Sequence, residues 1–238
     1  MHVNLLQIET DAEAVFVERP NRFLGIVDIL DPDSSNHTEV HVHDPGRLTD
    51  LLYPGNRVLI RRAANPKRKT HWDLIAAQHE EEWILVHAGF HRSIVSELIE
   101  DEIHSPFGKI AGYTPEVTVG HSRLDYRIDR VDGSPVWVEV KGCTMCEDGI
   151  AMFPDAPTAR GTRHLETLIN LKKRGEQAAI LFLVFRPEAR CFTANSEIDA
   201  LFAATLEKAE KHGIDIFALK FAYRDGLVFC LGRLPLCS

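Results

Sequence analysis

The sequence lacks any long hydrophobic run. No apolar stretch approaches the roughly 20 residues that a helix needs to cross a bilayer. No early segment has the length or flanks of a signal peptide. We therefore expect a cytoplasmic protein with no membrane partner. At 238 residues, of which 45% are hydrophobic, the chain can form two small cores or one large one.

Basic residues are outnumbered by acidic ones. The chain has 27 Lys and Arg against 35 Asp and Glu, and its net charge of −8 argues against indiscriminate binding of polyanions. Any nucleic-acid surface must therefore be local. One basic segment without acids surrounds the turn at Asn65-Pro66 and contains Arg57, Arg61, Arg62, Lys67, Arg68 and Lys69. These charges could follow a phosphate backbone, with Trp72 as a stacking surface; the alternative is an ordinary solvated hairpin tip.

Cysteine is scarce, with five residues in all. One pair, Cys143 and Cys146, has the CxxC spacing of a zinc or redox site, but no second pair of ligands follows. We interpret this pair as buried thiols in a reducing compartment. The twelve histidines also lack metal-ligand spacing. His41 and His43 share one strand face and could chelate weakly, although the alternation of side chains in a barrel strand accounts for them.

A predicted hairpin at residues 122–141 carries the most informative polar group. Apolar and polar residues alternate along both strands, so one face is apolar, and Asp125, Glu139 and Lys141 share the other. A two-residue turn at Asp132-Gly133 would put the two apolar rows on opposite faces. We therefore predict a three-residue loop that pairs Asp125 with Lys141.

These three side chains favour phosphodiester hydrolysis with a divalent metal ion. Two carboxylates in one small patch repel each other, and a cation between them relieves the repulsion. Hard oxygen ligands suit Mg²⁺ or Mn²⁺, and the ammonium of Lys141 could orient or deprotonate the attacking water. We predict Asp125 and Glu139 as metal ligands and all three residues as catalytic. The alternative is the solvated face of a half-buried hairpin.

The segments around the hairpin resemble the core of the restriction-endonuclease-like fold. An amphipathic helix is expected at residues 91–103, and a short strand at 116–119 precedes the hairpin. A loop and a helix at 159–174 follow it, and the apolar run 178–185 is typical of a strand buried on both faces. The order is helix, three strands, helix, strand. The PD-(D/E)xK signature of that fold resembles Asp125 and Glu139-x-Lys141.

The first part of the chain is rich in β-strand signals. Five short strands are predicted at residues 22–30, 38–43, 57–63, 71–78 and 83–87. With a helical turn at 47–52, they suit an OB-like β-barrel. We place the boundary near Ala88-Gly89, with an OB-like nucleic-acid-binding domain at 1–88 and a nuclease-like αβββαβ domain at 89–238. The predicted fold class is mixed α/β.

Five motifs in this order resemble the sugar fermentation stimulation protein A (SfsA) family. They are residues 122–125, 138–141, 151–156, 158–165 and 180–186. Arg22-Phe23-Leu24 and the run from Asp44 to Leu48 resemble the amino-terminal motifs of the family. The resemblance implies an OB-like barrel joined to a nuclease-fold domain, DNA binding, and a link to the regulation of sugar use. The chain departs from the family at Gly142-Cys143, where Ser-Val is common, and at residues 43–46, where Pro-Asn-Thr-Gly is usual.

Position and resemblance add further candidates. Glu97, in the helix before the sheet, is predicted to orient the attacking water; the alternative is an exposed helical glutamate. Asp155 could approach the metal or cap a turn. Four residues are predicted to contact nucleic acid in addition to the basic segment: Arg22, Arg47, Arg160 and His164.

Together these features predict a DNA-binding protein with a nuclease site dependent on Mg²⁺ or Mn²⁺. The alternative is a DNA-binding regulator of sugar-utilisation genes that keeps the nuclease fold without catalysis. The paired acids favour the enzyme, because a pure binding module gains nothing from their repulsion. A thiol or metal-cluster protein that uses Cys143 and Cys146 is a remote third hypothesis. The strand type of the DNA and the formation of a homo-oligomer stay open.

Overall fold

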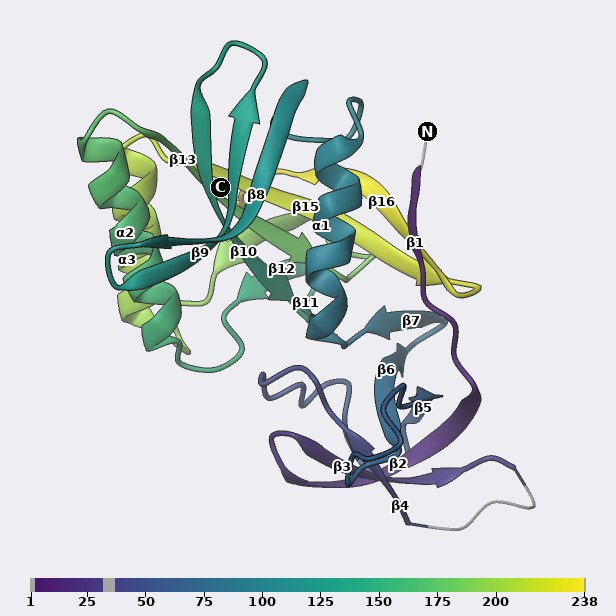
Figure 1. The fold of residues 1–238 in the computed structure, drawn as a ribbon. Coiled ribbons are helices and arrows are strands. Elements are labelled where there is room, and N and C mark those ends of the chain that lie inside the picture. The colour runs from purple at the N-terminus through teal and green to yellow at the C-terminus, as the bar shows by residue number, and fades with distance from the viewer. Residues whose placement is uncertain (1–2, 32–36, 238) are drawn as a thin grey trace.

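A five-stranded barrel forms the first part of the molecule. The structure, a computed structural model, describes residues 3–31 and 37–237 (Figure 1). Residues 1–2, 32–36 and 238 of the two predicted domains lie outside this description. The barrel strands are β2 (Ala12–Asn21), β3 (Leu24–Ile29), β4 (Thr38–His41), β5 (Arg57–Arg62) and β6 (Trp72–His79). They run in the order β4-β3-β2-β5-β6, and the parallel pairing of β4 with β6 closes the barrel. The predicted OB-like barrel is confirmed.

Two details of the predicted barrel were wrong. The sequence prediction missed β2, whose end contains Pro20, a residue that argues against a central strand. It also counted the strand β7 (Glu82–Leu85) as a barrel strand. In the structure, β7 pairs with β6 and, through Trp83 and Tyr223, with the other domain.

The second part of the chain is built on a mixed sheet. Its strands are β8 (Ile110–Val119), β9 (Ser122–Arg130), β10 (Pro135–Cys143), β13 (Gln177–Val184), β15 (Asp215–Arg224) and β16 (Leu227–Leu234). β10, β13 and β15 are parallel, and β8 and β9 form an antiparallel edge. The first strand, β1 (Val3–Gln7), pairs with β16. The predicted domain 1–88 therefore includes a strand that belongs to the second sheet.

Helices cover both faces of this sheet. The 3₁₀ turn η1 (Ala88–Phe90) leads into α1 (His91–Glu100), which packs on one face, while α2 (Ala159–Lys173) and α3 (Ala200–Lys211) lie side by side on the other (Figure 1). Side chains of β13 alternate between the two cores, with Leu181 on the α1 side and Phe182 on the α2 side. The predicted strand buried on both faces is confirmed. α1 ends at Glu100, before the predicted residue 103.

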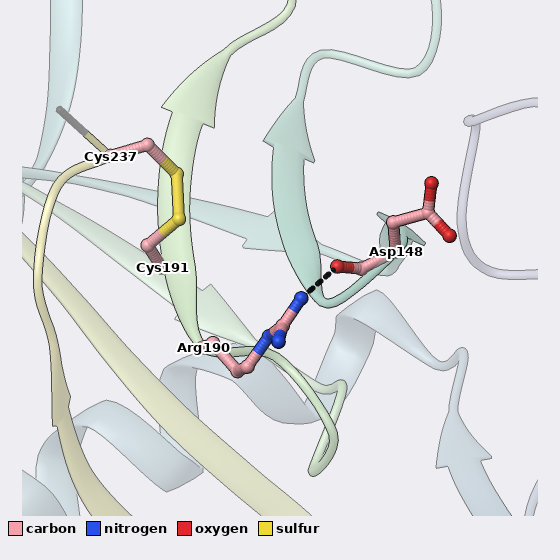
Figure 2. Close-up of a disulfide and its surroundings, with 4 residues drawn as sticks. All are labelled: Asp148, Arg190, Cys191 and Cys237. Atoms are coloured by element: carbon pink, nitrogen blue, oxygen red, sulfur yellow. Dashed lines mark hydrogen bonds between the residues drawn. A yellow bond between two sulfur atoms is a disulfide. The ribbon is translucent and has the colours of Figure 1, made fainter.

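The segment after β10, predicted as a loop, contains two short strands, β11 (Met145–Glu147) and β12 (Ile150–Phe153). They form a small sheet with β14 (Cys191–Ala194), which follows β13. Figure 2 shows the disulfide between Cys191 and Cys237, which joins the end of the chain to β14, and the bond from Arg190 to the Asp148 carbonyl. Neither cysteine had been predicted to pair.

One buried arginine fixes the barrel against the second domain. The side chain of Arg186 is 1% exposed and donates hydrogen bonds to Asp50, Glu188 and the Thr144 carbonyl. Its Nη2 also lies 2.8 Å from Nε2 of His79 in the barrel. A buried guanidinium needs several acceptors to offset its lost hydration, and here both domains supply them.

Among the described helices, none is long and apolar enough to cross a membrane.

Candidate active site

The hairpin β9–β10 brings the two predicted acids together. Its loop has three residues, as predicted, and the amide of Arg130 donates to the carbonyl of Ser134 across it. The ladder runs from Pro135–Asp129 to Val138–Tyr126 and ends one residue short of Asp125 and Glu139, beyond which the Asp125 carboxylate accepts from the Val140 amide. The predicted pairing of Asp125 with Lys141 was wrong by two residues. Gly133, at φ +83°, takes the left-handed position at the end of the loop and so fixes this register.

Glu139 has one satisfied and one unsatisfied carboxylate oxygen. The residue is 1% exposed, and its Oε1 accepts hydrogen bonds from Lys141 Nζ and His164 Nδ1. Among the described residues, no donor reaches the buried Oε2. Burial opposes the charge of this carboxylate, but the bonds from His164 and Lys141 outweigh it, and the pKa of Glu139 is lowered. A water molecule or a cation can satisfy such a buried oxygen.

Asp125 is held by the backbone of the neighbouring strand. Its Oδ2 accepts a hydrogen bond of 2.7 Å from the amide of Val140. Burial, followed by the charge of Glu139, raises the pKa of Asp125 to about 6. The charge of Glu139 thus opposes the ionisation of Asp125, as expected for two carboxylates in one small patch.

Two adjoining cavities open beside these acids. A cavity of about 220 Å³ is lined by Asp125, Glu116 and Arg92, and a larger one of about 500 Å³ lies between the barrel and the second domain and reaches Lys141. Both are lined by His91 and Val140. A Cβ at position 142 would lie 2.2 Å from the His91 ring, so Gly142 leaves the room that this histidine fills.

His164 and Glu97 do not take the positions predicted for them. The His164 ring is buried, with Nδ1 on Glu139 and Nε2 accepting a 3.4 Å bond from Nε of Arg160. It therefore supports Glu139 and is not available to a phosphate. α1 turns Ile94, Leu98 and their apolar neighbours to the sheet, which leaves Glu97 exposed on the opposite side. No contact with the paired acids is found for Glu97 in the described part of the chain.

The side chains of the basic segment fall into three groups: those that lie over an aromatic ring, those that pair with a carboxylate, and those that make neither contact. Arg61 lies 5.0 Å above the ring of Phe90, and Arg62 lies 4.6 Å above the ring of Trp72. Arg68 pairs with the buried carboxylate of Asp73 at 2.8 Å. Only the loop residues Lys67 and Lys69 are both exposed and without such a contact among the described residues. Arg62, Lys69 and Trp72 line a cavity of about 490 Å³ on the barrel.

A loop of the barrel closes over the larger cavity. Arg22 lines that cavity, and Arg22 and Arg47 are both exposed. Arg19, which the sequence prediction missed, donates to four carbonyl groups of this loop region, at Arg22, Asp44, Gly46 and Arg47. Asp155 accepts from the amide of Leu48 at 3.3 Å and so joins β12 to the barrel instead of approaching the paired acids. A Cβ at Gly46 would lie 2.3 Å from Asp155, so the approach requires glycine.

The CxxC pair lies beside the site without taking part in it. Cys143 is buried, and its thiol donates to the Met152 carbonyl at 3.2 Å. Burial raises the pKa of Cys143 well above its usual range and raises that of Cys146 to about 11. Burial therefore disfavours the thiolate, the form that binds metals and attacks a disulfide.

Two family models cover most of the chain. The model described as "Sugar fermentation stimulation protein RE domain" matches residues 89–226, and the "SfsA N-terminal OB domain" matches residues 17–86. Two relatives are sugar fermentation stimulation protein homologs. The one from Methanococcoides burtonii is 45% identical over 98% of this chain and 95% of that protein. The one from Thermotoga neapolitana is 43% identical over 98% of each.

A solved structure has the same fold over its full length. It is Pyrococcus furiosus SfsA in complex with Ca²⁺, which is 27% identical and superposes with a TM-score of 0.89. The match covers 99% of this chain and 100% of that one. The chain and Pyrococcus furiosus SfsA therefore share the same arrangement of barrel and sheet.

Proposed function

The chain belongs to the sugar fermentation stimulation protein (SfsA) family, and we propose that it is a DNA-binding nuclease that hydrolyses phosphodiester bonds with a divalent metal ion. One observation carries the proposal: Glu139 buries an oxygen that has no donor among the described residues, and it lies close enough to Asp125 for its charge to raise the pKa of that carboxyl. A module that only binds DNA has no use for such a pair.

Asp125 and Glu139 are the residues that would hold Mg²⁺ or Mn²⁺. Both offer carboxylate oxygens, the donors that these hard cations prefer, and the unpartnered Oε2 of Glu139 is free for one. The Ca²⁺ complex of the Pyrococcus furiosus relative supports an oxygen-ligand cation in this family. When bound, such an ion supplies Lewis-acid stabilisation of the charge that develops on a phosphate.

The other residues of the site orient these acids and manage protons. His164 and Lys141 fix the carboxylate of Glu139, and the Val140 amide fixes that of Asp125. The side chain of Lys141 is 15% exposed and its residue lines the larger cavity, so its ammonium can turn towards a phosphate in that cavity. Arg22 and Arg160 also line this cavity, and in this proposal they contact the DNA backbone.

The test is cleavage of labelled single-stranded DNA, duplex DNA and RNA in Mg²⁺ or Mn²⁺. Glu139→Gln and Lys141→Ala should each lower the single-turnover rate by about a thousandfold or more, roughly 4 kcal/mol of barrier. Asp129→Asn is the matched control, because Asp129 lies on β9, the strand of Asp125, but pairs with Arg127. Full cleavage by Glu139→Gln would refute the proposal. DNA binding without cleavage in any metal would favour the non-catalytic regulator.

A further inference from the structure

Two histidines and an aspartate from separate segments meet where β4 pairs with β6. His43 follows β4, Asp73 lies on β6, and His87 lies between β7 and η1. One ligand atom of each lies within 4.8 Å of the other two. We call these residues the barrel triad. None of them belongs to the paired acids or to the cavities beside them.

His87 has a ring nitrogen with no partner. The residue is 6% exposed, and its Nδ1 is buried without a hydrogen bond to any described residue. A neutral imidazole is the form that binds metal ions, and a buried nitrogen without a partner is costly unless a ligand satisfies it.

Asp73 supplies a charged oxygen that already attracts a cation. Its side chain is 6% exposed, and its Oδ1 lies 2.8 Å both from Nε2 of His43 and from Nη2 of Arg68. Burial opposes its charge, but these two bonds outweigh burial and lower the pKa of Asp73. Arg68 comes from the surface loop after β5 and is 29% exposed, so its guanidinium can leave for solvent when another cation arrives.

We propose that the barrel triad binds a transition-metal dication of the zinc class. Two imidazoles and one carboxylate suit Zn²⁺, whereas Mg²⁺ and Ca²⁺ prefer sites made of oxygen alone. Ligand atoms around zinc lie roughly 3.3 Å apart, given bonds of about 2.0 to 2.1 Å, so the side chains must close in from their present separation. Gly89 leaves room beside both rings, because a Cβ there would lie 3.1 Å from Nδ1 of His87 and 3.9 Å from Nδ1 of His43.

The ion would connect the β4–β6 pairing, which closes the barrel, to the segment that leads into α1. Asp73 belongs to the parallel pairing of β4 with β6, His43 follows that pairing by two residues, and His87 stands three residues before η1 ends. Three protein ligands leave a fourth position for water or another ligand. The barrel would then carry its own metal, different in chemistry from the oxygen pair at Asp125 and Glu139.

The test uses the full-length chain with the paired acids disabled by Asp125→Asn and Glu139→Gln. After treatment with a chelator, the protein is titrated with Zn²⁺ by calorimetry and with Co²⁺ by visible absorption. We expect one Zn²⁺ per chain, bound at least about a hundredfold more tightly than Mg²⁺. The Co²⁺ spectrum should lack the intense near-ultraviolet bands of a thiolate complex. Such bands would assign the metal to Cys143 and Cys146 and overturn the proposal.

Variants then decide which residues hold the ion. His87→Gln and Asp73→Asn should each weaken Zn²⁺ binding at least about tenfold, with circular dichroism checking that at least one stays folded. His71→Gln, an exposed histidine of the same barrel, is the matched control and should bind normally. Arg68→Ala should bind as tightly or more tightly, because a competing cation is gone. Unchanged binding in both triad variants, or no binding in either the background or Arg68→Ala, would overturn the proposal.

Discussion

Replacing Asp125 by Asn should stabilise the metal-free protein at neutral pH. Burial and the charge of Glu139 raise the pKa of Asp125 from 3.8 to about 6. A carboxyl group with a raised folded-state pKa favours folding fully below its unfolded pKa, and this contribution is lost as the pH rises through the folded value. A shift of roughly two units corresponds to about 3 kcal/mol, which ionised Asp125 costs the fold at pH 7 and Asn does not. The variant should therefore gain up to that amount.

Urea unfolding in a chelating buffer measures this difference. At pH 4 the variant and the wild type should be similar in unfolding free energy, and the variant should become more stable by about 2 to 3 kcal/mol as the pH rises to 7. Manganese at about a hundred times its dissociation constant should stabilise the wild type by about 2.7 kcal/mol and remove most of the gap. Asp129→Asn should show no such trend. A gap that is constant with pH, or that widens towards acid, would refute the electrostatic account of the paired acids.

Three further perturbations test separate parts of the structure. Lys67→Ala with Lys69→Ala should lower the slope of log affinity against log salt by about 0.7 to 0.9 per lost phosphate contact, and an unchanged slope would mean that the loop does not touch DNA. Arg68→Ala should lower the unfolding free energy by roughly 1 to 3 kcal/mol in urea, because Asp73 loses a buried partner; equal stability would contradict that pairing. His164→Ala should move the acidic limb of the cleavage rate to higher pH, because Glu139 loses a bond that lowers its pKa. If the acidic limb of the pH–rate profile does not move, His164 does not lower the pKa of Glu139 in the active enzyme.

The sequence predicted most faces of the site hairpin but not its register, and it was wrong for Leu124, which packs in the core on the α2 side while Tyr126 and Ile128 pack on the α1 side. Alternation of apolar residues requires only that opposed positions have an even sum, and a slip by two residues preserves every face. The choice between the two registers depends on the loop, where Gly133 takes a left-handed conformation and Asp132 accepts from Ser134. Both registers bring Asp125, Glu139 and Lys141 to one face, which is why the composition of the site could be predicted while its pairing could not.

Contacts between distant segments could not be predicted. Glu139 meets His164 only because α2 packs on the face of the sheet to which Glu139 points, and a helical periodicity cannot tell which sheet residue it will cover. Arg186 reaches Asp50 across 136 residues, through the docking of two domains. The barrel triad likewise depends on the closure of β4 onto β6, and its members lack any regular spacing in the chain.

The two proposed cation sites differ in their donor atoms, and this difference changes how metal dependence must be measured. Asp125 and Glu139 offer oxygen alone, whereas the barrel triad offers two imidazoles. Manganese accepts both kinds of donor, so stimulation by Mn²⁺ cannot by itself assign cleavage to the paired acids. Magnesium discriminates better, because it avoids imidazole. Cleavage that needs Mg²⁺, fails in Glu139→Gln and persists in His87→Gln would assign catalysis to the hairpin and leave the barrel metal a structural role. Loss of cleavage in a folded His87→Gln variant would instead require that the barrel metal helps to position the DNA.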